Sequence, residues 1–269
     1  MSGLDAMRAE LSAGMDTAKT ALAAADRLCE ACVVVLEVDG ASVSLIHDGA
    51  TQGTFGSSGE LSRHLDELQF TFGEGPCLDS VRGGRPILVA DLDDPAEQRW
   101  PAFRGAVLDA GMGSVFALPV AVANRPVGAL DLFRSKTGPL GGGQFGGAMH
   151  AAELAALPLL DLMSSDVDWE TAGQGADGWD QLSSLERVEV YQATGMIMAA
   201  AAVGPADALV RLRAYAFAHE TTASEVAFAI VERRLRLEPP DWPTDASGPP
   251  GPRPARRPGG LGGLGPGGR

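Results

Sequence analysis

The amino-acid composition changes abruptly at residues 166–181, which contain five acidic residues, three glycines and no basic residue. Like charges repel one another and glycine adds backbone freedom, so this composition is typical of a linker. After residue 238 the chain becomes rich in proline and glycine and almost devoid of apolar residues. These two breaks predict four parts: a large unit at 1–165, an acidic linker at 166–181, a small unit at 182–238 and a disordered tail at 239–269.

The overall composition narrows the classes of protein to consider. The formal net charge is −14 and the pI is about 4.6, which argues against a protein that coats nucleic-acid phosphates by charge alone. There is no 18-residue uncharged apolar run and no apolar signal segment at the N-terminus. Three cysteines cannot form a paired disulfide framework. We therefore expect a cytoplasmic protein that does not cross a membrane.

The N-terminal unit combines helical and strand patterns. Two strand-type runs flank the short polar turn Ala123-Asn124-Arg125, which predicts a hairpin. A second turn is expected at Asp39-Gly40. We expect helices at 4–30, 100–110 and 144–163, and strands within 33–49, 86–92, 114–122 and 126–133. This order predicts an α+β domain with an antiparallel sheet flanked by helices.

Three segments of this unit, taken in order, resemble the GAF sensor domains common in actinobacteria. They are Phe72-Gly-Glu-Gly-Pro-Cys-Leu78, Gly84-Arg-Pro-Ile-Leu-Val-Ala-Asp-Leu92, and the pair Pro119-Val120 with Val127-Gly-Ala-Leu130. The resemblance covers roughly residues 15–165. It implies an antiparallel sheet with packed helices, and either a pocket for a small ligand beside the sheet or a role in dimerisation.

The cysteines are the candidate reactive groups of the N-terminal unit. Cys77 follows a Gly-x-Gly-Pro loop and is a candidate ligand-binding or redox-sensitive thiol if its pKa is lowered, although simple apolar packing is the favoured interpretation. Cys29 and Cys32 have C-x-x-C spacing, but no second pair supplies the other two ligands of a zinc site. With Cys29 at a helix end and Cys32 at a strand start, we expect them to pack in the core. We expect no metal and no cofactor.

An enzymatic activity is the least favoured interpretation. Some proteins of the GAF fold reduce free methionine sulfoxide with cysteines. Here only Cys77 lies in the loop region that this resemblance implies, and no His/Cys or carboxylate pair stands at a useful spacing. We therefore expect that the protein is not an enzyme.

The C-terminal unit, residues 182–238, has a helical pattern throughout. The first helix, with Leu182 and Leu185 on its apolar face, is expected to run to about Ala202, where Gly204-Pro205 ends it and begins a second helix. Thr221 or Thr222 is expected to cap a third helix, and Glu225, three residues after Thr222, predicts a capping box. Residues up to Leu237 complete this helix. Because fewer than 60 residues make a small core, docking or dimerisation would help this unit fold.

The C-terminal unit resembles the ANTAR domain of bacterial transcription antitermination regulators. The matching residues are Arg187-x-x-Val190-x-x-Ala193-Thr194-Gly195-Met196-Ile197-Met198, then Ala208-x-x-x-Leu212-Arg213-x-Tyr215-Ala216, then Val226-Ala-x-Ala-Ile230-Val231. The resemblance implies a three-helix module that binds paired RNA hairpins, usually as a dimer, and so prevents a terminator from forming. The family commonly pairs this module with a receiver or a GAF domain.

The resemblance and the residue types together give a set of candidate RNA-binding residues. They are Arg187, Gln192, Thr194, Arg211, Arg213 and Tyr215. Many members of the family place a lysine where this chain has Thr194, so a phosphate contact is missing here. Arg211 and Arg213 point about 200° apart on a helix, so at most one faces a single RNA surface, and the family match favours Arg213. Arg187 on a solvated face and Tyr215 in the core are the alternatives.

We therefore predict a signal-responsive regulator that binds RNA hairpins as a homodimer and antiterminates transcription. Its GAF domain either binds a small-molecule ligand or mediates dimerisation. The alternative is a sensor or interaction protein whose C-terminal bundle only dimerises. The acidic charge balance and Thr194 favour that alternative.

Overall fold

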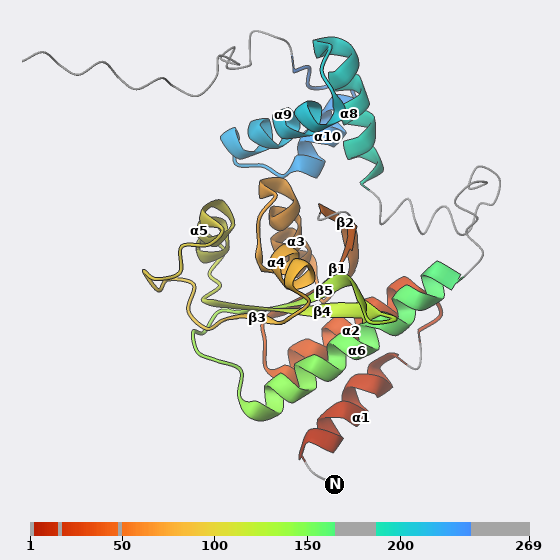
Figure 1. Cartoon of the computed structure of the whole chain (residues 1–269), viewed down its shortest axis with the longest axis vertical. Helices are drawn as coiled ribbons and strands as arrows, with labels where there is room; N and C mark the ends of the chain where they lie inside the picture. The colour runs from red at the N-terminus through yellow and green to blue at the C-terminus, as the bar shows by residue number, and fades with distance from the viewer. Residues whose placement is uncertain (1–2, 16–17, 48–49, 165–186, 238–269) are drawn as a thin grey trace, which may run out of the picture.

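The computed structural model describes residues 3–15, 18–47, 50–164 and 187–237 (Figure 1). Its centre is a five-stranded antiparallel sheet in the order β2-β1-β5-β4-β3. The strands are β1 Gly40–His47, β2 Ala50–Ser57, β3 Ile87–Val89, β4 Ser114–Val122 and β5 Arg125–Arg134. The predicted hairpin is confirmed as β4 and β5, which are joined by Ala123 and Asn124 at φ values of 49° and 65°. Positive φ at both turn residues matches the twist of antiparallel strands.

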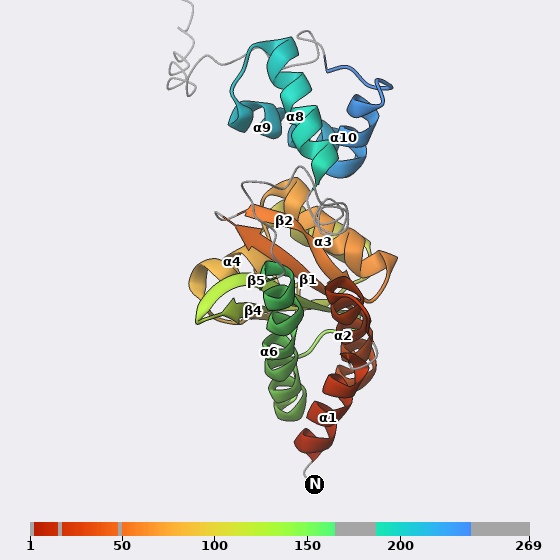
Figure 2. The ribbon, with the colours of Figure 1, turned by 90° about the vertical axis from the view of Figure 1, so that its right-hand side faces the viewer.

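One face of the sheet is covered by two long helices and a third that packs on them (Figures 1 and 2). These are α2 Ala21–Leu36 and α6 Gly142–Ser164, with α1 Gly3–Met15 outside them. Helix α2 crosses β2 closely, since a Cβ added at Gly56 would come within 2.6 Å of the Cβ of Ala25. The glycine therefore permits the close approach that buries this half of the core.

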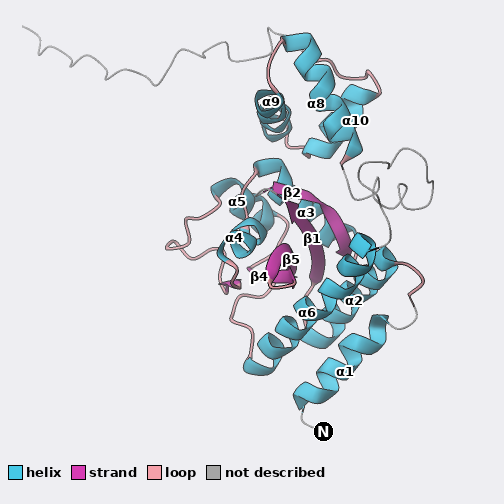
Figure 3. Cartoon of the chain, turned by 45° about the vertical axis from the view of Figure 1, so that its right-hand side comes forward, coloured by secondary structure: helices cyan, strands magenta, loops and turns pink. Residues whose placement is uncertain are grey.

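The opposite face of the sheet carries three shorter helices, as Figure 3 shows. They are α3 Glu60–Phe72, α4 Pro76–Gly83 and α5 Pro101–Asp109. Leu65 of α3 and Phe103 and Val107 of α5 are fully buried with Phe133 of β5 in a second apolar core. With helices on both faces of an antiparallel sheet, this is an α+β fold of the expected kind.

Two expectations for the first 50 residues are wrong. The single helix expected at 4–30 is two helices, and the second begins after Thr20, whose hydroxyl accepts a hydrogen bond from Ala23 N at 3.1 Å. The strand expected from residue 33 begins only at Gly40, because Val33–Leu36 continue α2. Helical spacing buries Cys29, Cys32 and Leu36 on one face, and that burial outweighs the weak strand preference of the valines. Cys32 therefore lies inside a helix and not at a strand start.

The C-terminal unit is formed by three helices around an apolar core that also includes Phe70 of α3. They are α8 Val188–Ala201, α9 Pro205–Ala218 and α10 Ala223–Val231. The predicted capping box is confirmed: Thr222 Oγ1 accepts from Glu225 N at 3.2 Å, and Glu225 accepts from Thr222 N at 3.0 Å. Helix α10 ends at Val231, earlier than expected, and Arg233 takes a left-handed φ of 58°. Leu182, Leu185, the linker 166–181 and the tail 239–269 lie outside the described residues.

Within the described segments, no single helix is long and apolar enough to cross a membrane. Helices α8 and α9 taken together have the length and composition of a span, but they are bent by 106° at the break between them. In the structure they pack with α10 around a shared apolar core, which accounts for their hydrophobicity.

Candidate functional site

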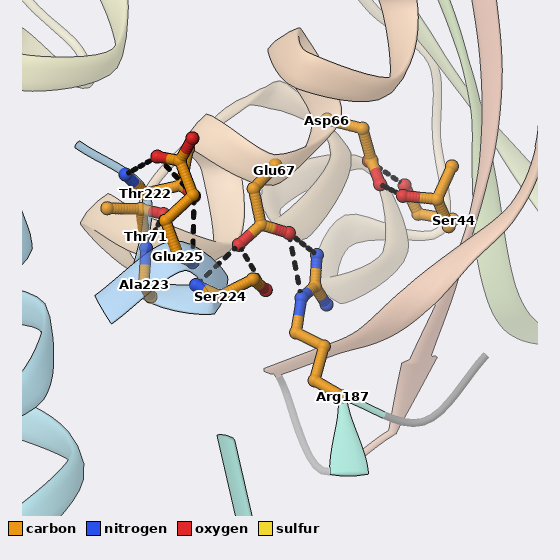
Figure 4. A network of polar contacts seen from close by, with 10 residues as sticks. Ser44, Asp66, Glu67, Thr71, Arg187, Thr222, Ala223, Ser224 and Glu225 are labelled. Carbon is orange, nitrogen blue, oxygen red and sulfur yellow. Dashed lines mark hydrogen bonds and ion pairs between the residues drawn. The ribbon is translucent and has the colours of Figure 1, made fainter. Parts of the chain in front are cut away.

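Helix α3 lies between the sheet and the C-terminal helices and carries polar residues toward both (Figures 2 and 4). Asp66 and Gln69 make their hydrogen bonds to the sheet side, whereas Glu67 and Thr71 make theirs to the C-terminal helices. Residues three or four apart share a helix face, so each pair has a side of its own. The candidate site is therefore this one helix with its two sets of partners.

On the inner side, Asp66 ties α3 to the first two strands. Its carboxylate accepts hydrogen bonds from the hydroxyl of Ser44 on β1 and from Thr54 Oγ1 on β2, the latter at 2.5 Å. Asp66 is fully buried. A buried carboxylate needs such partners to offset its lost hydration, so these bonds hold α3 at a defined position on the sheet.

A second buried carboxyl lies deeper in the same interior. Gln69 Nε2 donates to Asp131 Oδ2 at 2.6 Å, and Gln69 Oε1 accepts from Cys77 N at 2.9 Å. Burial, together with the nearby carboxylate of Asp66, raises the pKa of Asp131 well above its ordinary value. Asp131 Oδ1 and Ser42 Oγ have no hydrogen-bond partner among the described residues. These two buried atoms are thus able to form further hydrogen bonds, and one of them belongs to a carboxyl that favours its neutral form.

The cysteines lie in apolar surroundings. Cys77 is fully buried in a cluster with Ile46, Leu78 and Ala129. Cys29 and Cys32 are fully buried on the face of α2 that packs in the core. Burial raises the pKa of Cys32 to about 12 and raises that of Cys29 as well. A thiol with a raised pKa stays protonated and is a poor nucleophile and metal ligand. The described residues include no group of three or more side chains that would hold a metal ion.

On the outer side, Glu67 binds two C-terminal helices at once, as Figure 4 shows. Arg187 Nε and Nη2 donate to Glu67 Oε2 at 2.9 and 2.7 Å. Glu67 Oε1 accepts from Ser224 N at 3.3 Å and from Ser224 Oγ at 2.8 Å. The side chains of Arg187 and Glu67 are only 7% and 15% exposed, so solvent screens this ion pair weakly.

Phe70 lies next to Glu67 on the same side of α3 and carries two arginines. The guanidinium carbon of Arg187 is 3.9 Å from the centre of the Phe70 ring, and that of Arg213 is 4.5 Å from it. Burial and the neighbouring charge of Arg187 lower the pKa of Arg213, and its Nε has no hydrogen-bond partner among the described residues. Two like charges on one ring are held together by cation–π attraction and by Glu67.

Two further contacts complete this interface. Thr71 Oγ1 accepts a hydrogen bond from Ala223 N at 3.0 Å, which satisfies one of the free amides at the start of α10. The rings of Phe72 and Phe217 meet edge to face with their centres 5.8 Å apart. The interface between α3 and the C-terminal helices therefore combines an ion pair, cation–π contacts, hydrogen bonds from Ala223 and Ser224, and an aromatic pair.

The residues predicted to bind RNA do not all gather in one place. Arg187 and Arg213 meet at Phe70, whereas Gln192 is exposed on α8. The hydroxyl of Thr194 donates to the carbonyl of Val190, one turn earlier in its own helix, at 2.6 Å.

The other two candidates lie on α9. Tyr215 is partly buried against the C-terminal core and stacks on His219 with ring centres 3.9 Å apart. Arg211 is half-buried. Sequence reasoning missed Glu67, Phe70 and Thr71, because it predicted no helix over residues 60–72 and nothing local links them to residues 120 or more positions away.

A five-stranded antiparallel sheet between two helical layers, with a buried polar interior under α3, defines an α+β domain. The chain belongs to the GAF domain family, whose model matches residues 17–155. GAF domains mainly have regulatory and sensory roles, and some homologues are enzymes. The matched residues end before the C-terminal helices, so the resemblance of residues 182–238 to the ANTAR family stays a prediction.

Solved structures of low sequence identity share similarity with the GAF part. The GAF domain of a phosphoenolpyruvate-protein phosphotransferase from Coxiella burnetii is 16% identical with a TM-score of 0.49, and covers 60% of this chain and 95% of its own. The corresponding Acinetobacter domain is 9% identical with a TM-score of 0.48, covering 60% and 94%. Free methionine-R-sulfoxide reductase from Neisseria meningitidis is 12% identical with a TM-score of 0.43, covering 58% and 86%. No curated protein matches the chain.

Proposed function

We propose that the protein is a signal-responsive transcription regulator. Its C-terminal helices bind RNA hairpins and thereby antiterminate transcription, and its GAF domain senses a small ligand or mediates homodimerisation. The ANTAR resemblance of residues 182–238 supports this function, as does the three-helix unit with its capping box at Thr222 and Glu225. A regulatory GAF domain in the same chain fits the sensory half of the proposal.

The observation that carries the RNA part is the convergence of two arginines. Arg187 precedes α8 and Arg213 lies on α9, yet their guanidinium carbons lie within 4.5 Å of the centre of the same Phe70 ring. Each guanidinium is a planar set of donors suited to phosphate and to stacking on bases. Two such groups, one directly before α8 and one on α9, form a compact cationic pair that is suited to an RNA loop.

The interior of the GAF domain supports the sensing part. Asp131 Oδ1 and Ser42 Oγ are buried polar atoms without a hydrogen-bond partner among the described residues. A small ligand with complementary donors and acceptors would satisfy them, and it would lie next to Gln69 of α3.

A second candidate function is a sensor or interaction protein whose C-terminal bundle only dimerises. Several large apolar side chains of α8, α9 and α10 are exposed, which favours a protein partner for this unit. They are Tyr191, Met196, Val210, Phe217 and Phe228. The hydroxyl of Thr194 is also engaged by its own helix rather than directed at a ligand.

Titration of the full chain with a two-hairpin, small-loop RNA and a scrambled RNA, at two salt concentrations, tests the proposal. We expect loop-specific, salt-sensitive binding that Arg213→Ala weakens about tenfold or more, because phosphate contacts make affinity depend on salt. Arg236→Ala removes the same charge from an exposed position outside the Phe70 contact and should leave loop-specific binding nearly unchanged. Equal affinity for the hairpin RNA and the scrambled RNA would favour the dimerisation function.

A further inference from the structure

The contact with α3 covers the two arginines that the proposed function assigns to RNA. Arg187 is 7% exposed, and Arg213 lies over the face of Phe70 with its Nη1 against Gly73. While α3 occupies these positions, RNA cannot reach the Arg187 guanidinium, and no base can stack on the face of the half-buried Arg213 guanidinium that covers Phe70. The contact and RNA binding are therefore mutually exclusive at these two residues.

Glu67 and Phe70 also match the chemistry of the ligand they would exclude. The Glu67 carboxylate accepts from the Arg187 guanidinium and from Ser224 N in the first turn of α10, which are contacts that a phosphate group also makes. The Phe70 ring presents an aromatic face to both guanidinium groups, as a nucleobase does when arginine stacks on it. Glu67 and Phe70 of α3 thus make the contacts with Arg187 and Arg213 that a phosphate and a base of RNA would make.

We propose that α3 is an autoinhibitory element of the protein. In the docked arrangement described here, Glu67 and Phe70 occupy Arg187 and Arg213, and hairpin RNA binds only after the C-terminal helices separate from α3. This inference rests on the proposed RNA-binding function and adds its regulation. The same helix reaches the GAF interior through Asp66 and Gln69, so a ligand there would act on the element that holds the arginines.

The separation of α3 from the C-terminal helices can be measured without RNA. Thr71 is 1% exposed and accepts from Ala223 N, so a thiol introduced by Thr71→Cys in the full chain reacts with a maleimide only when the contact opens. The native Cys29, Cys32 and Cys77 are buried and give the background rate in the unaltered chain. We expect Glu67→Gln to raise the labelling rate about tenfold or more, because it leaves the Arg187 charge without its partner. Glu60→Gln, an exposed change in the first turn of α3, is the matched control.

Locking the contact tests whether it blocks RNA. Thr71→Cys combined with Ala223→Cys places two thiols across the interface, and oxidation should join them, as mass spectrometry under non-reducing conditions would verify. We expect the oxidised full chain to lose hairpin binding by about tenfold or more and to regain it on reduction, and we expect Glu67→Gln to bind more tightly than the unaltered chain. Saturating RNA should also raise the labelling rate of Thr71→Cys, because linkage is reciprocal.

The possible outcomes separate the two proposals. Hairpin binding of equal strength in the oxidised and reduced proteins would overturn autoinhibition and leave the RNA-binding function standing. A chain that does not become crosslinked, with fast labelling at position 71 in the absence of RNA, would also overturn it. Fast labelling of the Glu67→Gln variant would show that its C-terminal helices have separated from α3. If this variant then binds no hairpin RNA, both the RNA-binding function and the autoinhibition are overturned.

Discussion

Two nitrogens of the Arg187 guanidinium donate to a single carboxylate oxygen of Glu67, at 2.9 and 2.7 Å, across 120 residues of sequence. The other oxygen of Glu67 is used by Ser224. One carboxylate therefore joins the residue before α8 and the first turn of α10 to the GAF domain. Because both side chains are largely buried, the loss of either charge leaves the other without compensation.

A double-mutant cycle should measure this relationship. We expect Glu67→Gln and Arg187→Met to show a coupling of about 1–3 kcal/mol in the free energy of unfolding of the full chain, measured by urea denaturation. The exposed pair Arg234 and Glu232, treated in the same way, should couple by about 0.5 kcal/mol or less. Equal coupling in both pairs would show that the buried pair does not hold the C-terminal helices.

Asp131→Asn should stabilise the protein at neutral pH. The pKa of Asp131 is raised in the folded state, so the unfolded chain releases this proton at a lower pH than the folded chain does. Stability is thus lost as pH rises above the unfolded pKa of about 3.9. We expect the variant to be more stable than the unaltered chain at pH 7, with the difference shrinking toward pH 4, in urea denaturation at several pH values. Asp109→Asn, at an exposed position, should show no such trend.

Asp39→Asn should have the opposite effect and destabilise the protein at neutral pH. Hydrogen bonds from Ser135 N and Ser135 Oγ, at 2.7 and 2.8 Å, lower the pKa of the Asp39 carboxyl. The ionised carboxylate therefore stabilises the folded state above the pKa that Asp39 has in the unfolded chain. This contribution is lost as pH falls through the lower pKa of the folded state. We expect the variant to be less stable than the unaltered chain at pH 7 and to approach it at low pH. A constant difference from pH 7 to pH 2.5 would contradict this account.

Thr222→Ala should weaken the start of α10. The Thr222 hydroxyl caps Glu225 N, and such caps contribute about 1 kcal/mol. The next two residues donate their backbone N–H groups to Thr71 and Glu67, so fraying here should also loosen the contact with α3. Thermal unfolding of the full chain measures the loss, and Thr222→Ser, which keeps the hydroxyl, should restore most of the stability. If Thr222→Ser loses as much as Thr222→Ala, the cap is not the cause.

Features determined by neighbouring residues were predictable from the sequence. The β4–β5 hairpin and the Thr222–Glu225 capping box depend on side chains within a few positions of one another, and both are confirmed. The strand expected over Val33–Leu36 is wrong because the local strand preference of these residues is outweighed by the burial, against the sheet, of one face of the helix that they continue.

The candidate site was not predictable in this way. Helix α3 buries the polar residues Asp66, Gln69 and Thr71, so its sequence lacks a clean apolar stripe and no helix was predicted there. The arginines were singled out as candidates, but their partners Glu67 and Phe70 lie more than 100 residues away and have no sequence pattern in common with them. Only the packing of α3 against α9, α10 and Arg187, the residue before α8, brings them together.

Asp66 and Glu67 are consecutive, yet one is bonded to the strands and the other to the C-terminal helices. Consecutive residues of an α-helix point about 100° apart, so a one-residue insertion early in α3 would turn both side chains away from their partners together. Substitutions on this helix can alter one set of contacts and spare the other, but a change in its length cannot. The number of residues between the start of α3 at Glu60 and Asp66 therefore sets the contacts with the strands and the contacts with the C-terminal helices at the same time.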